Sequence, residues 1–561
     1  MKDFHFHPRL LTDLRRYNKQ KFAADTMAGL IVGIVALPLA IAFGIASGVS
    51  PEKGIITAIV AGFIISALGG SRVQIGGPTG AFIVIIYGII QQFGLSGLMV
   101  ATMLAGAFLI LLGLFRLGTI IKFIPYPIVV GFTSGIALTI FTTQIKDLFG
   151  LSIESVPADF ISKWIVYVKH FSTIDWASSA VGILSIAIIA LTPKVSKKIP
   201  GSLIAIVVMT LAVYLLKEFA GITSVKTIGD FYPNIKAQIP ALTVPDITWE
   251  QVKLLFPTAM TIAVLGAIES LLSATVADGV TGSRHDSNQE LIGQGVANLC
   301  TPLFGGIPAT GAIARTMTNI NNGGRTPVSG IIHAAVLLLI FLVLMPLAAY
   351  IPMACLAGVL VVVSYNMSGW RTFRALMKNP KSDITVLLIT FLLTVIFDLT
   401  IAIEVGLVIA CLLFMRRMAE TTQVKVIAEE IDPAEEIDVQ LHEEEHLIIP
   451  KGVEVYEING PYFFGIANKF EDLMAGMANH PKVRIIRMRR VPFIDSTGIH
   501  NLQTLCAMSQ REGTQIILSG VQDKVYEVLD HAGLCLELGK ENICPNINVA
   551  LERAEKITRE Q

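Results

Sequence analysis

Long apolar runs alternate with short polar breaks from Met27 to about Arg416. A helix needs roughly 20 apolar residues to cross the hydrocarbon core of a bilayer. Three further segments, 78–91, 291–302 and 309–320, are shorter, and glycine or proline residues lie in or beside them. Together with eleven longer runs they predict an all-α polytopic membrane domain of fourteen elements, the longer runs being 27–47, 55–68, 98–114, 128–143, 177–191, 203–216, 254–277, 331–350, 354–363, 384–397 and 401–414.

The pattern changes after Arg417. An acidic stretch with few apolar positions predicts a linker, and from Val453 strand-like and helix-like segments alternate, which indicates a small α/β domain. We expect strands at 453–458, 483–488 and 515–518 and helices at 470–477, 498–509 and 521–529. The predicted organisation is an N-terminal segment, a transmembrane domain, an acidic linker and the α/β domain, at residues 1–26, 27–417, 418–452 and 453–561.

Composition supports a membrane protein, because 53% of the residues are hydrophobic and only 15% are charged, against about 25% charged in soluble proteins. The formal net charge is zero, which gives no basic face for nucleic acid. Basic residues cluster before the first run and after the last, and Lys and Arg next to spans stay cytoplasmic. The chain is therefore predicted to be a multi-pass protein of the inner (plasma) membrane with both termini in the cytoplasm.

Signatures of enzyme chemistry are missing from the sequence. The six cysteines form no CxxC pair, and no phosphate-binding loop, metal-ligand spacing or nucleophile–base motif is found. We therefore expect no metal, no cofactor and no enzymatic activity.

The most informative feature is an internal repeat. Residues 76–82 read Gly-Gly-Pro-Thr-Gly-Ala-Phe, and residues 305–313 read Gly-Gly-Ile-Pro-Ala-Thr-Gly-Ala-Ile. The two breaks begin the third element of each group of seven, and an odd number of spans per group makes the two halves inverted repeats. A broken helix leaves backbone N–H groups free at its positive end, so two such ends at mid-membrane depth can bind an anion. The alternative is that these residues only kink packed helices.

Two charged residues lie inside or next to apolar elements. Glu269 is deep in the 254–277 run, where a carboxylate must face protein or water. It could carry a coupled proton, balance a cation, or accept a structural hydrogen bond from a broken helix; Ser273, at i+4, shares its face. Arg315 follows the second break and could attract an anion, pair with Glu269, or reach lipid headgroups.

These residues resemble a known family. The two breaks, the stretch Gly-Ala-Ile-Glu-Ser-Leu-Leu at 266–272, and Gly-Gln-Gly at 293–295 followed by Asn298 are similar to the sulfate permease (SulP) family, and most of all to its bacterial sulfate and C4-dicarboxylate branch. The resemblance covers nearly the whole chain. It implies a 7+7 inverted repeat divided into core and gate subdomains, usually as a homodimer.

The resemblance also implies site residues. By motif match the substrate would bind at Thr79, Gly80, Ala81, Gly311, Ala312 and Arg315, with Glu269 and Ser273 serving the coupling ion. Sodium-coupled bicarbonate members carry Asp and Thr at the positions of Glu269 and Ser273, and a hydroxyl residue near Ile313. Those departures favour H+ over Na+ as the coupling ion.

The C-terminal domain resembles the STAS domain that ends most members of the family, on the motif Val-Pro-Phe-Ile-Asp-Ser-Thr-Gly at 491–498. The serine that matches Ser496 is phosphorylated in anti-sigma-factor antagonists, which share this domain. A phosphate on Ser496 would be stabilised at a helix N-terminus and could control a cytoplasmic regulatory partner. The alternative, which we favour, is that Asp495 and Ser496 only cap the helix.

The sequence thus favours a secondary active transporter of small anions, with sulfate-type oxyanions carried by alternating access and proton coupling. C4-dicarboxylates such as succinate, or bicarbonate, are the alternatives within the family. A nucleobase carrier with similar broken helices, an anion channel, and a membrane sensor that signals through the STAS domain remain open.

Overall fold

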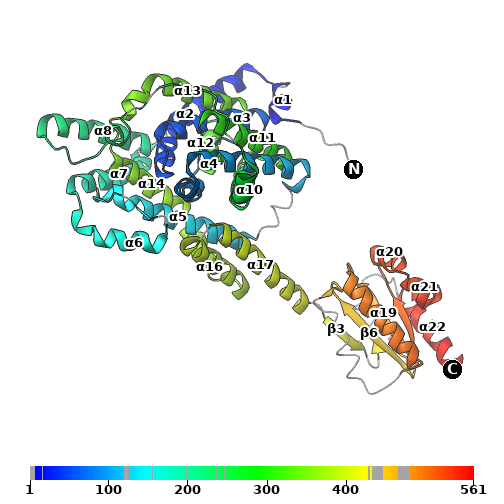
Figure 1. The fold of residues 1–561 in the computed structure, drawn as a ribbon. Coiled ribbons are helices and arrows are strands. Elements are labelled where there is room, and N and C mark those ends of the chain that lie inside the picture. The colour runs from blue at the N-terminus through cyan, green and yellow to red at the C-terminus, as the bar shows by residue number, and fades with distance from the viewer. Residues whose placement is uncertain are drawn as a thin grey trace. The chain divides into compact units, whose positions relative to one another are not determined.

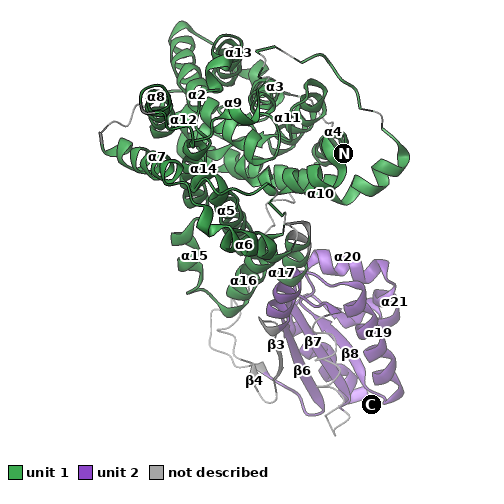
Figure 2. Ribbon diagram, turned by 60° about the vertical axis from the view of Figure 1, so that its left-hand side comes forward, with its two compact units in different colours: residues 1–410 green, residues 411–561 purple. Residues whose placement is uncertain are grey.

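The structure is a computed structural model, and it describes residues 7–15, 17–118, 125–154, 156–157, 159–195, 200–233, 235, 237–238, 240–245, 247–397, 399–421, 423–427, 430–431, 447–464 and 481–560. The chain divides into two compact units, residues 1–410 and 411–561, which Figure 2 shows in different colours.

The first unit is built from helices, the last of which, α17, runs on into the residues of the second unit (Figure 1). Nine helical stretches among the described residues are long and apolar enough to cross a membrane. The main helices are α2 (Lys19–Ala46), α3 (Pro51–Leu68), α4 (Ile83–Leu114), α5 (Tyr126–Leu148), α7 (Trp176–Val195), α8 (Gly201–Ala220), α10 (Trp249–Thr281), α11 (Ser287–Cys300), α12 (Ile313–Asn321), α13 (Val328–Ala348), α14 (Met353–Met367), α16 (Lys381–Ile396) and α17 (Leu399–Thr421). Short helices accompany them: α1 (Arg9–Leu14), α6 (Phe160–Lys169), α9 (Ile228–Phe231) and α15 (Trp370–Leu376).

Helix α4 contains two of the predicted elements. Gly94 within it has φ 66° and ψ −171°, which are not helical, and glycine adopts positive φ without steric penalty. With α4 counted on both sides of Gly94, the main helices supply all fourteen predicted elements within the described part of the chain. The prediction of a fourteen-element membrane domain is confirmed.

Helix α2 starts earlier than the apolar pattern indicates. It begins at Lys19, inside the segment 1–26 that the sequence analysis places before the membrane domain. The Asn18 side chain accepts a hydrogen bond from the Lys21 N–H at 2.8 Å and so caps the helix. A capped polar first turn carries no hydrophobic signal, which explains why hydropathy alone missed it.

The helices pack in two groups that match the expected core and gate. In the core, α4 packs on α10 and α11, α13 packs on α2 and α3, and α12 packs on α10 and α2. In the gate, α5 packs on α14 and α16, and α7 packs on α14 and α8. Equivalent helices of the two halves therefore fall into the same group, as an inverted repeat requires.

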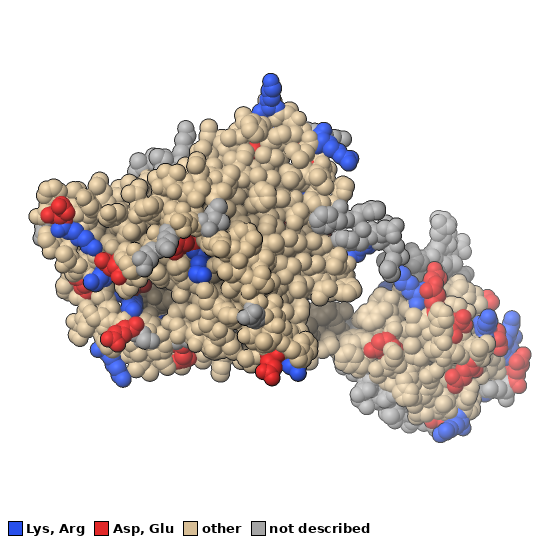
Figure 3. Space-filling model, turned by 45° about the horizontal axis from the view of Figure 1, so that its top comes forward, with Lys and Arg blue, Asp and Glu red and all other residues tan. Residues whose placement is uncertain are grey.

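The surface of the first unit is largely apolar. Over its middle, the face visible in Figure 3 carries almost no Lys, Arg, Asp or Glu. Large side chains such as Trp176, Phe219 and Leu339 are exposed there or on other faces. In lipid these side chains need no protein cover, so their exposure fits a membrane domain.

The second unit holds a five-stranded sheet in the order β3-β6-β7-β8-β9. β3 (Gln423–Ile427) is antiparallel to β6 (Val453–Asn459), and β7 (Val483–Arg490), β8 (Gln515–Ser519) and β9 (Ile543–Cys544) continue in parallel. Separate apolar clusters lie on its two faces, with α19 (Ser496–Arg511), α20 (Asp523–His531) and α21 (Leu534–Leu538) contributing to one and α22 (Ile547–Glu560) to the other. The three expected strands are present, whereas the helix expected at 470–477 lies outside the described residues.

Strand β3 lies within the segment 418–452 that the sequence analysis treats as a linker. Its five residues pair in register with β6, from Gln423 opposite Asn459 to Ile427 opposite Val455. The acidic residues that follow β3 dominate the composition of the segment, and a five-residue edge strand is too short to change that average.

A close contact between the core helices α4 and α11 depends on glycine. A Cβ atom on Gly106 of α4 would lie 2.7 Å from the Gly295 carbonyl oxygen and 2.8 Å from the Leu299 nitrogen of α11. Small residues allow this backbone contact between membrane helices. We predict that Gly106→Ala lowers the free energy of unfolding by about 1–3 kcal/mol through overpacking.

Thermal unfolding of the detergent-solubilised protein measures this loss. Gly88→Ala in the same helix is the matched control, because no atom lies within 4 Å of the added Cβ. Equal melting temperatures for the two variants would contradict the assigned helix contact.

Candidate functional site

The two sequence breaks meet as a short antiparallel ladder. β1 (Gly76–Gly77) pairs with β2 (Thr310–Gly311), with Gly76 opposite Gly311 and Gly77 opposite Thr310. The Ala312 N–H extends the ladder by donating to the Ile75 carbonyl at 2.9 Å. Backbone groups that the broken helices leave without partners therefore satisfy each other inside the protein, as the membrane interior requires.

Each strand leads directly into a helix N-terminus. A 3₁₀ turn, η1 (Gly80–Phe82), opens α4, and Ala312 is the N-cap of α12. The first N–H groups of a helix have no acceptor within that helix, and the macrodipole places positive potential at the same end. The ladder thus brings two positive helix ends together, and Thr79, Gly80, Ala81, Gly311 and Ala312 all lie at this junction.

Glu269 reaches the first break. It lies on α10, and its Oε2 accepts a hydrogen bond from the Thr79 hydroxyl at 3.0 Å. The side chain is partly buried. One predicted coupling residue and one predicted substrate residue are therefore in direct contact.

Arg315 is enclosed by protein, with only 2% of its surface exposed. Its Nη2 donates to the Pro78 carbonyl at 2.6 Å, while its Nη1 is buried without a hydrogen-bond partner. A Cβ on Gly77 would collide with the guanidinium, so glycine is needed for this approach. This placement excludes contact with lipid headgroups, and no ion pair with Glu269 is found among the described residues.

Ser273 lies beside the ladder and hydrogen-bonds to Thr316, whereas Glu269 contacts Thr79. The Ser273 hydroxyl donates to the Thr316 Oγ1 at 3.3 Å, and Thr316 Oγ1 also accepts the Ile75 N–H at 3.1 Å. Ser273 is fully enclosed and joins α10 to the first turn of α12. The predicted site residues therefore form one cluster, with Ser273 behind the ladder.

The first break faces the gate helices. A Cβ on Gly80 would lie 3.0 Å from Met367 Sδ, 3.2 Å from Ile140 Cδ1 and 3.6 Å from Phe43 Cε1, on or next to α14, α5 and α2. A cavity of about 690 Å³ is lined by α10 residues such as Leu272, by residues of the loop after α10, and by Tyr126 and Val129 of α5. The junction thus lies where core and gate meet.

Sequence reasoning missed a second carboxylate beside the ladder. Glu290 of α11 is fully buried, and its Oε2 accepts the N–H groups of Gly70 and Ser71, each at 2.8 Å. Its Oε1 accepts Gln74 Nε2 at 2.9 Å, and the same nitrogen donates to Ser270 Oγ at 2.6 Å. Glu290 therefore fixes the chain that leads into β1.

A signal for Glu290 existed in the sequence. It lies four residues before Gln294, so both side chains share one helix face, and Ser270 Oγ contacts both at 3.5 Å and 3.3 Å. On the same face, Asn298 bonds the N–H and the carbonyl of Ala309 at 2.9 Å and 2.8 Å, next to β2. One helix face thus anchors both breaks.

Ser496 is exposed at the start of α19 in the second unit. The N-cap is Asp495, whose Oδ1 accepts the Gly498 N–H at 2.8 Å, while its Oδ2 accepts the Phe464 N–H at 3.1 Å. Asp495 thus provides the cap, and the Ser496 hydroxyl is open to solvent.

The variant Glu290→Gln tests whether Glu290 fixes the chain that leads into β1. In either orientation the amide NH₂ would face the N–H donors of Gly70 and Ser71 or that of Gln74. We predict a loss of about 3 kcal/mol in the free energy of unfolding, because buried donors lose their acceptor. Thermal unfolding in detergent measures it. Glu269→Gln is the control, since its amide oxygen can still accept from Thr79; an equal loss in both variants would contradict the anchoring role.

Comparison with known proteins gives consistent matches. The sulfate permease family model matches residues 22–390, and the STAS domain model matches residues 447–550. YvdB of Bacillus subtilis (strain 168), provisionally named a sulfate transporter, is 41% identical over 94% of this chain and 96% of its own length. The bicarbonate transporter BicA of Picosynechococcus sp. is 33% identical over 79% of each chain.

Solved structures agree. The transmembrane domain of a cyanobacterial BicA aligns with a TM-score of 0.61 at 30% identity, over 70% of this chain and 98% of that one. The murine anion transporter Slc26a9 shares the fold, with a TM-score of 0.87 at 20% identity over 99% and 96% of the two chains. These relatives are transporters and not enzymes. The chain therefore belongs to the sulfate permease family of anion transporters and carries a C-terminal STAS domain.

Proposed function

We propose that the chain is a secondary active transporter that carries sulfate-type oxyanions by alternating access, coupled to protons. The observation that supports this most is the β1–β2 ladder, which places two positive helix ends and the Glu269 carboxylate at one site. Thr79, Gly80, Ala81 and Gly311 supply backbone and hydroxyl groups to the anion, Ala312 holds the start of α12 in place through its N–H in the ladder, and Arg315 adds positive charge from behind.

The anion would bind here without a lysine ammonium in the site. Free N–H groups at two helix ends can surround an oxyanion, and their hydrogen bonds replace its hydration. The Arg315 guanidinium is held against Pro78, so its charge raises the potential at the break without contacting the anion. Such a site selects for negative charge and small size.

The position of Glu269 supports proton coupling. When ionised, the carboxylate accepts the Thr79 hydroxyl and places a negative charge beside the anion. Protonation removes this repulsion, so a proton and an anion would bind together more readily than either alone. Movement of the loaded site then carries both across, which is symport. Ser273 would support the coupling residue indirectly, by holding α10 against α12.

Alternating access is supported by two cavities at opposite ends of α5. The cavity of about 690 Å³ includes Tyr126 and Val129 at the start of this helix. Another of about 300 Å³ includes Lys146 and Asp147 at its end. Both lie between core and gate helices, as expected if these groups move past one another to expose the site to either side.

Sulfate is preferred over bicarbonate on two grounds. YvdB, the relative at 41% identity, is named for sulfate, whereas BicA is 33% identical. In addition, this chain has Glu269 and Ser273 at the two positions where the sodium-coupled bicarbonate members that it resembles carry Asp and Thr.

We further propose a homodimer in the inner (plasma) membrane, with both termini in the cytoplasm and the STAS domain open to a regulatory partner at Ser496.

Uptake into proteoliposomes tests the proposal. We expect radiolabelled sulfate to accumulate when an inward proton gradient is imposed, and succinate or bicarbonate to accumulate less; an inward sodium gradient should have no effect. Anion currents without gradient-driven accumulation would instead identify a channel, and binding without flux would identify a sensor. Empty liposomes provide the background.

Glu269→Gln should abolish uptake driven by a pH gradient and leave sulfate–sulfate exchange at a measurable fraction of the wild-type rate. The neutral amide keeps the contact with Thr79 but cannot release a proton. Parallel assays of net uptake and of exchange separate the two processes. Gradient-driven uptake by Glu269→Gln at the wild-type rate would remove Glu269 from the coupling mechanism.

A further inference from the structure

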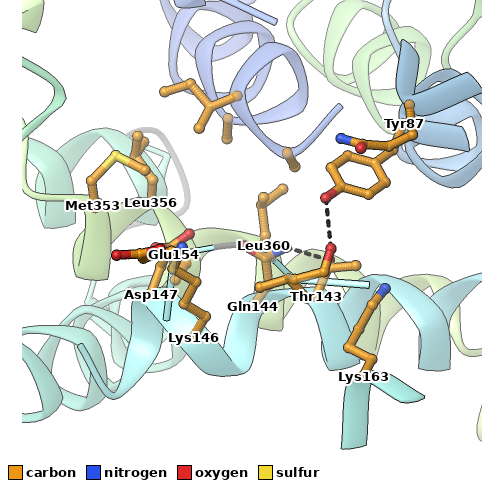
Figure 4. A pocket seen from close by; sticks show the side chains of 16 residues that line it. Tyr87, Thr143, Gln144, Lys146, Asp147, Glu154, Lys163, Met353, Leu356 and Leu360 are labelled. Atoms are coloured by element: carbon orange, nitrogen blue, oxygen red, sulfur yellow. Dashed lines mark hydrogen bonds between the residues drawn. The ribbon is translucent and has the colours of Figure 1, made fainter. Parts of the chain in front are cut away.

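The cavity at the far end of α5 contains a buried lysine that the transport site does not explain. The cavity has a volume of about 300 Å³ and none of the proposed substrate or coupling residues line it. Figure 4 shows Lys163 of helix α6 with its amine turned towards Tyr87 and Thr143. Only 3% of Lys163 is exposed, although α6 is a short helix outside the membrane spans.

Lys163 makes no side-chain hydrogen bond or ion pair with any residue that the structure describes. Burial of the ammonium lowers the pKa of Lys163, and the opposite charge of Asp159 counteracts this only in part. A buried cation in a cavity of this size is stabilised if an anion occupies the cavity beside it.

The nearby carboxylates do not serve as that partner. Asp147 and Glu154 line the same cavity, but in Figure 4 they lie next to Lys146, across the cavity from Lys163. Asp159, the N-cap residue of α6, lines a neighbouring cavity of about 410 Å³ together with Lys163, but it is exposed and accepts the Ser162 N–H at 2.7 Å. Its negative charge offsets part of the Lys163 charge, and no ion pair between the two is found among the described residues.

Polar groups surround this end. The Tyr87 hydroxyl donates to the Val156 carbonyl at 3.0 Å, and Gln144 Nε2 donates to Thr143 Oγ1 at 2.7 Å. The Gln91 side chain also lines the cavity. Cation, hydroxyls and amides together resemble the lining of a site for a small hydrated anion.

Two helices that line this cavity, α4 and α5, also contribute residues at or beside the transport site. Tyr87 belongs to α4, which begins at the first break, and Ile140, which packs beside Gly80, lies one turn before Thr143 on α5. We propose that Lys163 forms a second anion site, which receives the small inorganic anion at the membrane face where α5 ends, before the anion reaches the helix breaks. This inference rests on the proposed transport function.

Protection from chemical modification tests the site without requiring transport. Ethyl acetimidate modifies lysine amines, and peptide mass spectrometry reports the modification rate of each lysine. We expect sodium sulfate to slow modification of Lys163 about tenfold relative to sucrose of equal osmolarity, and to leave Lys169 unchanged. Lys169 is the matched control, because it is exposed on the same helix. Equal rates at Lys163 with sulfate and sucrose would overturn the proposal.

Transport kinetics locate the site. Intact cells and inside-out vesicles present opposite faces of the protein to the radiolabelled sulfate. Lys163→Met should raise the KM for sulfate about tenfold from the face that carries α6, with little change in kcat and none in the KM from the other face. Lys169→Met should change neither KM. Equal effects from both faces, or an effect on kcat alone, would show a structural role and overturn the proposal.

Restoration of the charge keeps the test valid if Lys163→Met folds poorly. Lys163→Cys modified with 2-aminoethyl methanethiosulfonate regains an amine, and its KM should return towards the wild-type value. Methyl methanethiosulfonate, which adds no charge, should not restore it. Sulfate uptake by the wild type without protection of Lys163 rejects this site alone, whereas protection without uptake rejects the proposed transport function.

Discussion

The structure depends on the requirement that no backbone polar group stays unpaired inside a membrane. Two helices, α4 and α12, begin inside the membrane domain, and a short stretch of extended backbone precedes the first turn of each. The ladder between Gly76–Gly77 and Thr310–Gly311 pairs these stretches with each other. That solution forces two positive helix ends together, so the requirement that stabilises the fold also creates an anion site.

Charge balance around this ladder uses carboxylates with different surroundings. Glu290 is fully buried and holds two N–H groups and an amide, so its role is to fix the chain entering β1. Glu269 is partly buried and has Thr79 as its described partner, so it can change protonation with little effect on the fold. Arg315 supplies a permanent positive charge behind the break. A fixed charge, a fixed anchor and one titratable group are what coupled anion binding needs.

The fourteen elements were predicted from the sequence because hydropathy and the repeated Thr-Gly-Ala break carry strong signals, whereas the core and gate grouping and the STAS domain were implied by the family resemblance. The resemblance also placed Thr79 and Glu269 in the same predicted site. The sequence could not reveal that Ser273 faces Thr316, that Arg315 binds Pro78, or that Glu290 anchors Gly70, because these contacts join residues more than 40 positions apart. The start of α2 and strand β3 were missed because capped polar turns and short edge strands barely change local composition.

The central claim is that backbone N–H groups at the first break bind the anion. No hydrogen-bond partner of the Gly80 N–H is found among the described residues. Thr79, the residue before it, has φ −127° and ψ 158°, which is the extended conformation that a residue before proline prefers. Proline is also accepted at the first position of a helix. Gly80→Pro therefore removes this donor, while Gly80→Ala adds a comparable Cβ and keeps it. The direct measurement is equilibrium binding of radiolabelled sulfate to both purified variants. We predict at least about fivefold weaker binding for Gly80→Pro than for Gly80→Ala, since a lost hydrogen bond to a charged group exceeds 1 kcal/mol. Equal affinities would contradict the account.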